Sequence, residues 1–308
     1  MTAPSGPIRN LSDNEFQRLV DLTGATGVVS GPVPPILGDP IADRHIHLLA
    51  EARGYRQRND VGVAGLVSVG GLLLERTTAT AWQAMQRAAR ADGIIMSLWS
   101  GYRSTSRQRQ IFRNKLSARG HGVASVRAGR ADAAIEAILT VSSVPGTSRH
   151  HTGRAIDVLS PGFGSSTFDQ SAAYRWLSRN NFVNAKRHGF VPSYPPAAGL
   201  QGPDPESWEY VYVGAEALSS SSRLATLQGF EVRSAEGGSR VVVTGTPIDP
   251  DDEYVLFADD RPLVVTFGRC SPGAAPGTFR LSSSTDSEVD LCVVQRWASQ
   301  ERLISCLT

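Results

Sequence analysis

A short polar segment, SRHHTGRAID at residues 148–157, carries residue types that can bind a metal ion. His150 and Asp157 lie seven positions apart, and Gly153 and Ala155 between them are small enough to let the backbone turn and pack tightly. An imidazole and a carboxylate suit zinc, which in catalytic sites usually takes three protein ligands and leaves one position for water. The segment therefore predicts part of a metal site, and the remaining groups must come from elsewhere.

The segment PESWEYVY at residues 205–212 offers two further carboxylates, Glu206 and Glu209. A helical turn would place side chains three positions apart on one side, whereas a regular strand would point them to opposite faces. If both glutamates serve one site, the segment must therefore bend. His151, beside His150, is expected either to support the site without binding the metal or to be exposed, and it is the alternative ligand if Glu209 does not bind.

Three blocks of this chain resemble a known family. Ser148, His150, Gly153, Ala155 and Asp157 match the S-x-H-x-x-G-x-A-x-D pattern of the VanY-like D-alanyl-D-alanine carboxypeptidases, which are peptidoglycan metallopeptidases. The stretches SGYRSTSRQ and ESWEYVY are similar to that family's S-G-Y-R-S-x-x-x-Q and E-x-W-H-x-x-Y. The blocks occur in the family's order, and the resemblance covers roughly residues 42–215.

The resemblance implies an α+β zinc-peptidase domain, with a small antiparallel sheet and helices, and one bound Zn²⁺. It implies that His150, Asp157 and, by position, Glu209 are metal ligands. It implies two catalytic roles. Glu206 would be the general base that takes a proton from the attacking water, and Arg103 would supply a fixed positive charge that stabilises the oxyanion. Substrate-binding residues would be Tyr102, Gln108 and Ser148.

Position 209 departs from the pattern, because it is Glu where the family has His. A carboxylate oxygen can still bind zinc at about 2.0 to 2.2 Å. Two carboxylates and one neutral imidazole would cancel the charge of a divalent ion, so bound water would be less acidic than at a site with two histidines. The greater oxygen content also weakens discrimination against other divalent metals such as Mn²⁺. A catalytic metal site and a metal-free or purely structural site both remain open.

The elements that must position these residues follow from hydrophobic spacing and end signals. Trp82, Met85 and Ala89 recur at helical intervals and predict one apolar face. Helices are expected over 13–22 (with Asp13 as its cap), 42–55, 75–93, 129–139 and 168–189. Residues 100–116 are expected to be a loop that leads into a helix. Strands are expected over 94–99, 155–159 and 209–213. This mixture predicts an α+β architecture.

The composition changes near Ser219, where SSSSR indicates a linker. Six short strand-like runs follow, separated by Gly, Pro, Asp and Ser, and they favour a sandwich or a small barrel. We therefore expect an N-terminal preamble (1–41), the metallopeptidase domain (42–218) and a small all-β accessory domain (219–308). The accessory domain carries no motif that assigns it a role.

Composition limits the remaining possibilities. With 308 residues, 41% hydrophobic content and a net charge of +2, the chain gives no sign of nucleic-acid or membrane-surface binding. The uncharged run at 61–74 is too short to span a bilayer and contains four glycines. The three cysteines are expected to be reduced thiols: Cys270, Cys292 and Cys306. The first residues lack the features of a secretory signal.

Two functional hypotheses follow. The first is a metal-dependent peptidase that hydrolyses peptidoglycan stem peptides, as a D,D- or L,D-carboxypeptidase or an endopeptidase. Because no export signal is visible, this hypothesis favours a bacterial effector that is cytoplasmic in its producer and is delivered to a periplasm or cell wall by a phage or an injection system. The alternative is that it acts in the cytoplasm on soluble muropeptides or another peptide. The second is a catalytically inactive peptidoglycan-binding or structural component of such an apparatus, a reading supported by Glu209.

Overall fold

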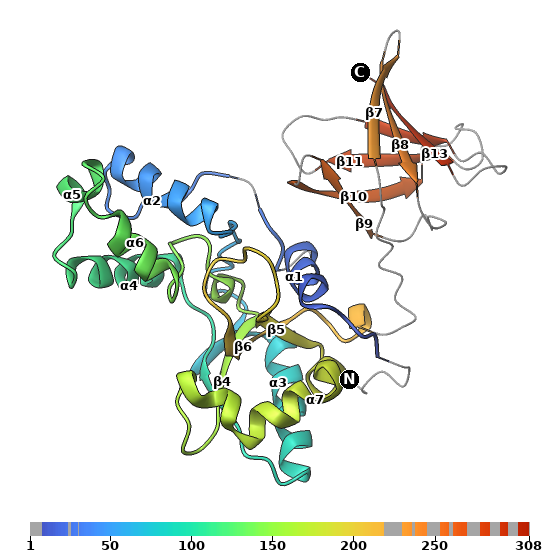
Figure 1. The fold of residues 1–308 in the computed structure, drawn as a ribbon. Coiled ribbons are helices and arrows are strands. Elements are labelled where there is room, and N and C mark those ends of the chain that lie inside the picture. The colour runs from blue at the N-terminus through green and yellow to red at the C-terminus, as the bar shows by residue number, and fades with distance from the viewer. Residues whose placement is uncertain are drawn as a thin grey trace. The chain divides into compact units, whose positions relative to one another are not determined.

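The computed structural model describes residues 8–23, 26–29 and 31–218, and the backbone of seven strands between residues 230 and 307. The chain divides into two compact units, Met1–Ser220 and Ser221–Thr308, which are described separately (Figure 1). The three blocks that carry the family resemblance all lie in the first unit.

Seven α-helices are described in the first unit. They are α1 (Asp13–Leu22), α2 (Pro40–Ala52), α3 (Arg76–Ala91), α4 (Thr105–Ser117), α5 (Val123–Arg127), α6 (Asp132–Leu139) and α7 (Ala172–Arg187). Short 3-10 helices are η1 (Arg149–Thr152), η2 (Ser165–Gln170) and η3 (Glu216–Leu218). The expected cap of α1 is wrong by one residue, because Ser12 accepts the Glu15 N–H and the Glu15 carboxylate accepts the Ser12 N–H.

A four-stranded antiparallel sheet lies at the centre of this unit, with the order β3-β4-β6-β5. Its strands are β3 (Ser97–Ser100), β4 (Ala155–Leu159), β5 (Phe190–Tyr194) and β6 (Glu206–Tyr212). A separate hairpin is formed by β1 (Leu66–Val69) and β2 (Leu72–Glu75). Small antiparallel sheets among helices confirm the mixed α/β class expected for this part of the chain.

The uncharged run at 61–74 contributes β1 and part of β2. Two glycines with positive φ, Gly70 and Gly71, form the turn between the two strands. Within the part of the chain that the structure describes, no helix is both long and apolar enough to cross a membrane.

Two apolar clusters stabilise the first unit. The larger one joins α3 and α7 to the sheet, and Trp82, Met85 and Ala89 lie in it as the helical spacing predicted. The second joins α2, α4, α5 and α6 around Ile46, Phe112 and others. Figure 1 shows α3 and α7 beside the sheet and the α2, α4, α5 and α6 group apart from them.

Helix α7 is interrupted by three residues in the left-handed region, Asn180, Asn181 and Phe182. The Asn181 amide uses both of its ends on the backbone of Leu11: it accepts from the N–H at 2.9 Å and donates to the carbonyl at 2.7 Å. The interruption therefore fixes the N-terminal segment to the unit, and α1 packs against β5. The expected preamble is thus part of the same compact unit.

In the second unit the strands form one antiparallel sheet of order β7-β8-β13-β12-β11-β10-β9. They are β7 (Phe230–Ala235), β8 (Gly238–Thr244), β9 (Glu253–Ala258), β10 (Arg261–Arg269), β11 (Thr278–Ser283), β12 (Asp290–Val294) and β13 (Glu301–Leu307). Six of these strands were expected from the sequence, and β13 was not. The accessory role of this unit stays a prediction, and the state of the three cysteine thiols lies outside the described residues.

Candidate metal centre and active site

The polar segment around His150 folds as a tight connection into the central sheet. Residues 149–152 form η1, Gly153 adopts φ +68° as its C-terminal cap, and β4 begins at Ala155. A Cβ atom at position 153 would lie 3.0 Å from Leu66 and 3.2 Å from the Glu75 nitrogen, so only glycine fits without adjustment. In β4, Asp157 pairs directly with Glu209 of β6. This pairing brings the two carboxylates to the same part of the sheet.

Three buried donor groups converge at this point: His150, Asp157 and Glu209, whose candidate ligand atoms all lie within 4.8 Å of one another. His150 Nε2 lies 3.4 Å from Asp157 Oδ1 and 3.2 Å from Glu209 Oε2. Its Nδ1 donates to the Gly101 carbonyl at 2.6 Å, which directs Nε2 toward the carboxylates. Ligands at 2.0 to 2.2 Å in a tetrahedral zinc site lie about 3.3 to 3.6 Å apart, so this arrangement fits a small divalent cation.

A second observation supports that fit. Asp157 Oδ1 is buried and, among the described residues, has no hydrogen-bond partner. The 3.4 Å ion-pair contact with His150 Nε2 compensates its charge only in part, and coordination of a cation would supply the missing close contact. The donor set of one imidazole and two carboxylates is suited to zinc and also to harder divalent metals.

The segment at residues 205–212, which must bend if Glu206 and Glu209 are to share a site, is irregular where it forms β6. Glu206 is paired with Tyr194, and Tyr210 with Pro192, so four steps along β6 correspond to two along β5. The two extra residues make the pairing locally irregular, which we call a bulge, and regular alternation of side chains is not maintained through such a stretch. The bulge therefore reconciles a strand with the placement of both glutamates near one site.

The charges at the site depend on one another. Burial, followed by the neighbouring carboxylates of Glu209 and Asp157, raises the pKa of Glu206 well above its usual value. Burial would also raise the pKa of Glu209, but His150, the Ser193 hydroxyl and a nearby arginine lower it to about 2. Burial alone would lower the pKa of His150, whereas the facing Asp157 and Glu209 raise it to about 10. Without a metal the histidine therefore carries the compensating positive charge.

Arg103 is held near this centre by contacts on both its backbone and its side chain. Its N–H donates to the His150 carbonyl at 3.1 Å, and its carbonyl accepts from His151 Nδ1 at 2.5 Å. Its guanidinium donates to Gln108 at 3.0 Å and to the Ser100 hydroxyl at 3.4 Å. The guanidinium is half-buried and close enough to lower the pKa of His150 by repulsion.

The three residues assigned to substrate binding occupy different environments. Gln108 is fully buried and donates to the Ser142 hydroxyl and the Ser143 carbonyl, so its contact with the site is through Arg103. Ser148 is also buried, at 2% exposed. Only Tyr102 is half-exposed, and its hydroxyl donates to Asp60 at 2.7 Å. The substrate-binding role of all three residues stays a prediction, and in this structure only Tyr102 is partly open to solvent.

His151 has no ring nitrogen left for a metal. Its Nδ1 donates to the Arg103 carbonyl, and its Nε2 accepts from the Gly146 N–H at 3.1 Å. It is fully buried, and burial lowers its pKa to about 4. These contacts argue against His151 as the substitute ligand and agree with a supporting place beside the site, whereas the alternative that His151 is exposed is wrong.

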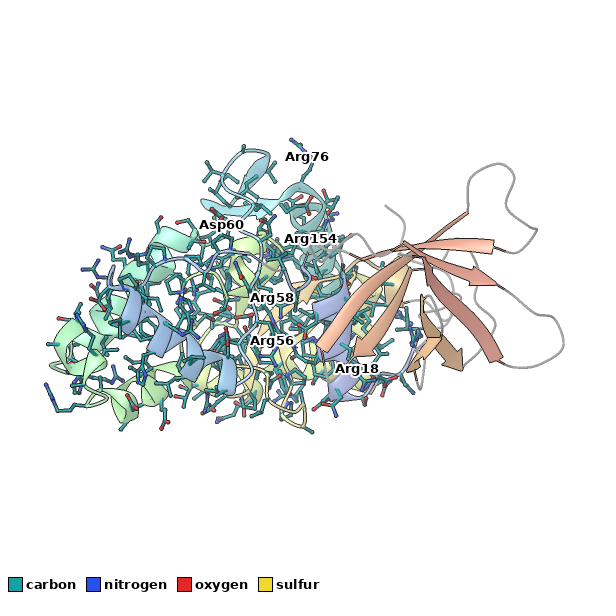
Figure 2. The ribbon with its side chains drawn as sticks, turned by 90° about the horizontal axis from the view of Figure 1, so that it is seen from above. Arg18, Arg56, Arg58, Asp60, Arg76 and Arg154 are labelled. Carbon is teal, nitrogen blue, oxygen red and sulfur yellow. The ribbon has the colours of Figure 1, made fainter. Side chains whose placement is uncertain are left out.

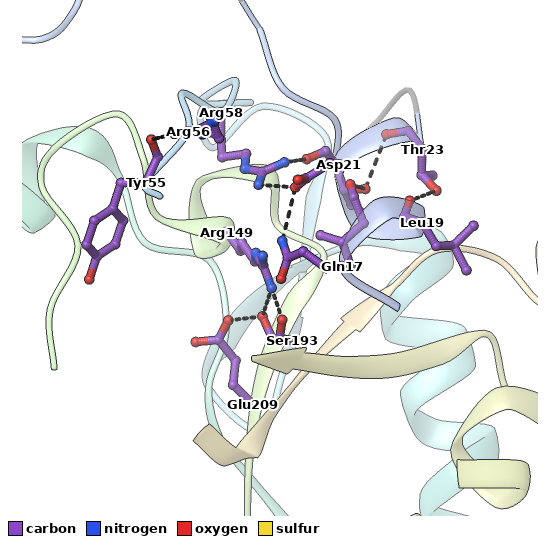
Figure 3. A network of polar contacts seen from close by, with 12 residues as sticks. Gln17, Leu19, Asp21, Thr23, Tyr55, Arg56, Arg58, Arg149, Ser193 and Glu209 are labelled. Atoms are coloured by element: carbon purple, nitrogen blue, oxygen red, sulfur yellow. Dashed lines mark hydrogen bonds and ion pairs between the residues drawn. The ribbon is translucent and has the colours of Figure 1, made fainter. Parts of the chain in front are cut away.

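Sequence reasoning missed the polar residues behind Glu209. Ser193 of β5 donates from its hydroxyl to Glu209 Oε1 at 2.6 Å, and Arg149 donates to Ser193 (Figure 3). Arg58 pairs with Asp21 of α1 at 2.5 Å nearby. Arg58 is 5% exposed. Figure 2 shows it among the side chains of the unit, whereas Arg76 lies at the margin. One sequence gives no signal for Ser193, since nothing marks a serine in a buried strand as a partner of a glutamate.

Comparison with known proteins identifies the family of this region. The family described as VanY, D-alanyl-D-alanine carboxypeptidase, matches residues 71–215. A curated D-alanyl-D-alanine carboxypeptidase of Enterococcus faecalis (strain ATCC 700802 / V583) is 39% identical over 136 residues, which are 43% of this chain and 45% of that protein. The Bacillus subtilis (strain 168) protein YodJ is 31% identical over 148 residues, 47% of this chain and 48% of YodJ. The chain thus spans less than half the length of these curated relatives.

Among solved structures, similarity extends to a mutant of the vancomycin resistance D,D-pentapeptidase VanY in complex with Zn(II), and to VanYB in complex with D-alanine-D-alanine. Each is 32% identical, with a TM-score of 0.39 and coverage of 53% of this chain. The matches cover 88% and 84% of those chains. Through residues 71–215, the chain therefore belongs to the VanY-like family of D-alanyl-D-alanine carboxypeptidases.

Proposed function

We propose that this protein is a metal-dependent peptidase that hydrolyses peptidoglycan stem peptides. The observation that carries the proposal is the convergence of His150 Nε2, Asp157 Oδ1 and Glu209 Oε2 at distances suited to one small cation. These three residues would hold the ion, with zinc as the metal of choice. The same site could take another divalent metal, because two of its three ligands are carboxylates.

The chemistry follows from the groups around the three ligands. A bound divalent ion acts as a Lewis acid and makes water a stronger nucleophile near neutral pH. Glu206 is the general base, because its raised pKa suits a group that takes a proton at neutral pH and returns it to the leaving amine. Arg103 supplies a fixed positive charge for the oxyanion that forms on the attacked carbonyl.

The substrate class rests on the family. The E. faecalis relative is named for D-alanyl-D-alanine, and VanYB was solved with D-alanine-D-alanine. We therefore propose a peptide ending in D-alanine as the first substrate to test, with carboxypeptidase action of D,D or L,D type and endopeptidase action as the alternatives. Residues 219–308 are proposed to form an accessory domain, and delivery of the chain to a cell wall as an effector remains part of the proposal.

Glu209 also supports a second candidate function. A chain that has lost a histidine ligand could keep the peptidase fold and serve as a peptidoglycan-binding component of a phage or injection apparatus. This alternative predicts binding of muropeptides without hydrolysis. The chemistry of residue 209 favours the enzyme, because a glutamate retains a ligand atom that an alanine or a leucine would not.

Replacement of Glu206 by Gln separates the two functions. The full chain is incubated with three kinds of muropeptide, and the products are identified by mass spectrometry. The first ends in D-Ala-D-Ala, the second ends in a single D-Ala that follows an L-amino-acid or L-configured centre, and the third is cross-linked. The enzyme hypothesis predicts release of D-alanine or a cleaved cross-link by the parent, and a loss of at least about 100-fold in Glu206→Gln with metal content unchanged.

Glu136→Gln is the matched control, because it makes the same chemical change on an exposed face of α6. It should keep the full rate. Absence of hydrolysis by metal-loaded parent protein, together with saturable muropeptide binding, would support the binding component instead.

A further inference from the structure

The two oxygens of Glu209 have different partners. Oε2 faces His150 Nε2 at 3.2 Å, on the side where the three candidate ligands converge. Oε1 accepts a hydrogen bond from the Ser193 hydroxyl at 2.6 Å. Both side chains are buried, with Ser193 at 0% and Glu209 at 5% exposed, and they come from the adjacent strands β5 and β6. Oε1 is therefore already engaged by a buried hydrogen bond, and Oε2 is the oxygen that faces His150.

Arg149 fixes the direction in which Ser193 donates. Its guanidinium donates to the Ser193 hydroxyl oxygen at 2.9 Å and also to the Ser193 carbonyl. Because the hydroxyl oxygen already accepts from Arg149, its own hydrogen is directed to Glu209. Arg149 is 2% exposed and lies over the Tyr194 ring, 4.0 Å from its centroid, so its position is well defined by packing.

Charge explains why this network suits a glutamate. Asp157, Glu206 and Glu209 place three carboxylates around one imidazole, and Arg149 is the buried cation on the far side of Ser193. Arg149 in turn is near the Asp21 carboxylate of α1, which pairs with Arg58. In Figure 3 the Arg149 side chain lies between the Ser193 and Glu209 pair and the Gln17 and Asp21 pair. A buried positive charge here stabilises an anionic ligand and would not favour a neutral one.

We propose that Ser193 and Arg149 are positioning residues that present a single oxygen of Glu209 to the metal, and that they allow a glutamate to serve where the family pattern has histidine. This inference rests on the proposed metal site. Its readout is metal affinity and metal preference, which are measured without any substrate.

The test uses the full chain and compares Ser193→Ala with Ser193→Thr. Affinities for zinc and manganese are measured by competition with a chromophoric chelator. Loss of an outer-shell hydrogen bond to a metal ligand typically costs about 10 to 100-fold in affinity, and we expect zinc affinity of Ser193→Ala to fall in that range. Ser193→Thr keeps the hydroxyl and should stay near the parent value.

Metal preference gives a second readout. Removal of the hydroxyl frees Oε1, so that Glu209 can bind with both oxygens, a mode that suits harder and larger cations. The ratio of zinc affinity to manganese affinity should therefore fall in Ser193→Ala. A change confined to packing would not alter this ratio.

The matched control is Ser171→Ala. Ser171 is also fully buried, but its hydroxyl accepts from the Tyr174 N–H at the start of α7. Its loss should lower the melting temperature and leave both metal affinities unchanged.

The decisive comparison uses a variant in which residue 209 is the histidine of the family pattern. In Glu209→His, the added changes Ser193→Ala and Arg149→Met should leave zinc affinity nearly unchanged, whereas each weakens it in the parent. Equal zinc affinity of the parent and Ser193→Ala, or equal losses in both backgrounds, would overturn the inference alone. A correctly folded parent that binds no added zinc would overturn the proposed metal site and this inference together.

Discussion

Glutamate at position 209 changes the charge of the candidate centre and keeps its geometry. The separations from His150 Nε2 to the two carboxylates, 3.2 and 3.4 Å, suit tetrahedral ligation as a two-histidine site would. The extra negative charge instead raises the pKa of Glu206, after the effect of burial. We therefore expect Glu209 to alter the metal preference of the centre and to preserve its binding geometry.

His151 should make the stability of the metal-free protein depend on pH. Its folded pKa is about 4, whereas its ordinary value is 6.5, so only the unfolded chain takes up a proton between these values. Stability should thus fall as the pH is lowered from 6.5 toward 4, by about 2 kcal/mol between pH 6.5 and 5. Urea unfolding at several pH values, with a chelator present, measures this change.

His151→Gln is the comparison for that experiment. The variant should be less stable at neutral pH, because it loses at least one of the two buried hydrogen bonds of the ring. Its unfolding free energy should change less between pH 6.5 and 5 than that of the parent. The same pH dependence in both proteins would show that His151 is not the titrating group.

At the scale of elements, much of the positioning frame could be predicted from the sequence. The spacing of Trp82, Met85 and Ala89 predicted α3, and the β-branched run at 155–159 predicted β4 with its observed bounds. The requirement that Glu206 and Glu209 share a site predicted a bend in the next segment. What the sequence could not provide was the bulge that makes this bend, since a bulge depends on the register against β5.

The polar partners of the ligands could not be predicted for a related reason. Ser193 and Arg149 meet Glu209 only after β5 and β6 have paired and η1 has folded beside them. Asp21 and Arg58 are 37 positions apart and belong to no motif. Long-range pairing of buried polar groups follows from the tertiary fold, which local patterns do not encode.

Substitution of Gly153, in the turn between η1 and β4, should affect both stability and metal binding. Gly153→Ala forces an unfavourable left-handed conformation and a close contact with Leu66 and Glu75, at a cost of roughly 2 to 4 kcal/mol. Because the turn links His150 to Asp157, zinc affinity should fall as well. Thermal unfolding and chelator competition measure the two effects.

Gly129 offers the matched control for that substitution. Its φ of +66° is nearly the same as the +68° of Gly153, but nothing lies within 4 Å of a Cβ atom there. Gly129→Ala should cost about 1 kcal/mol from the backbone alone and leave metal affinity unchanged. Similar losses of stability in the two variants would refute the claim that close packing at Gly153 matters.

At the scale of the whole molecule, the candidate site and both apolar clusters lie within residues 1–220. A chain ending at residue 220 should therefore fold with one cooperative transition and bind the same amount of metal as the full chain. Calorimetry and elemental analysis of the two chains provide the comparison. A truncated chain that aggregates or loses its metal would show that residues 221–308 are required for the fold of the first unit.

The most direct test of the account is the metal content of the full chain, purified without a histidine tag or added metal, beside Glu209→Ala. We expect close to one divalent ion, most simply zinc, per parent chain and its loss from the variant, since Glu209 supplies one of the three candidate ligand atoms. Parent protein that contains no metal, and that takes up none when zinc is added back, would contradict the proposed metal centre.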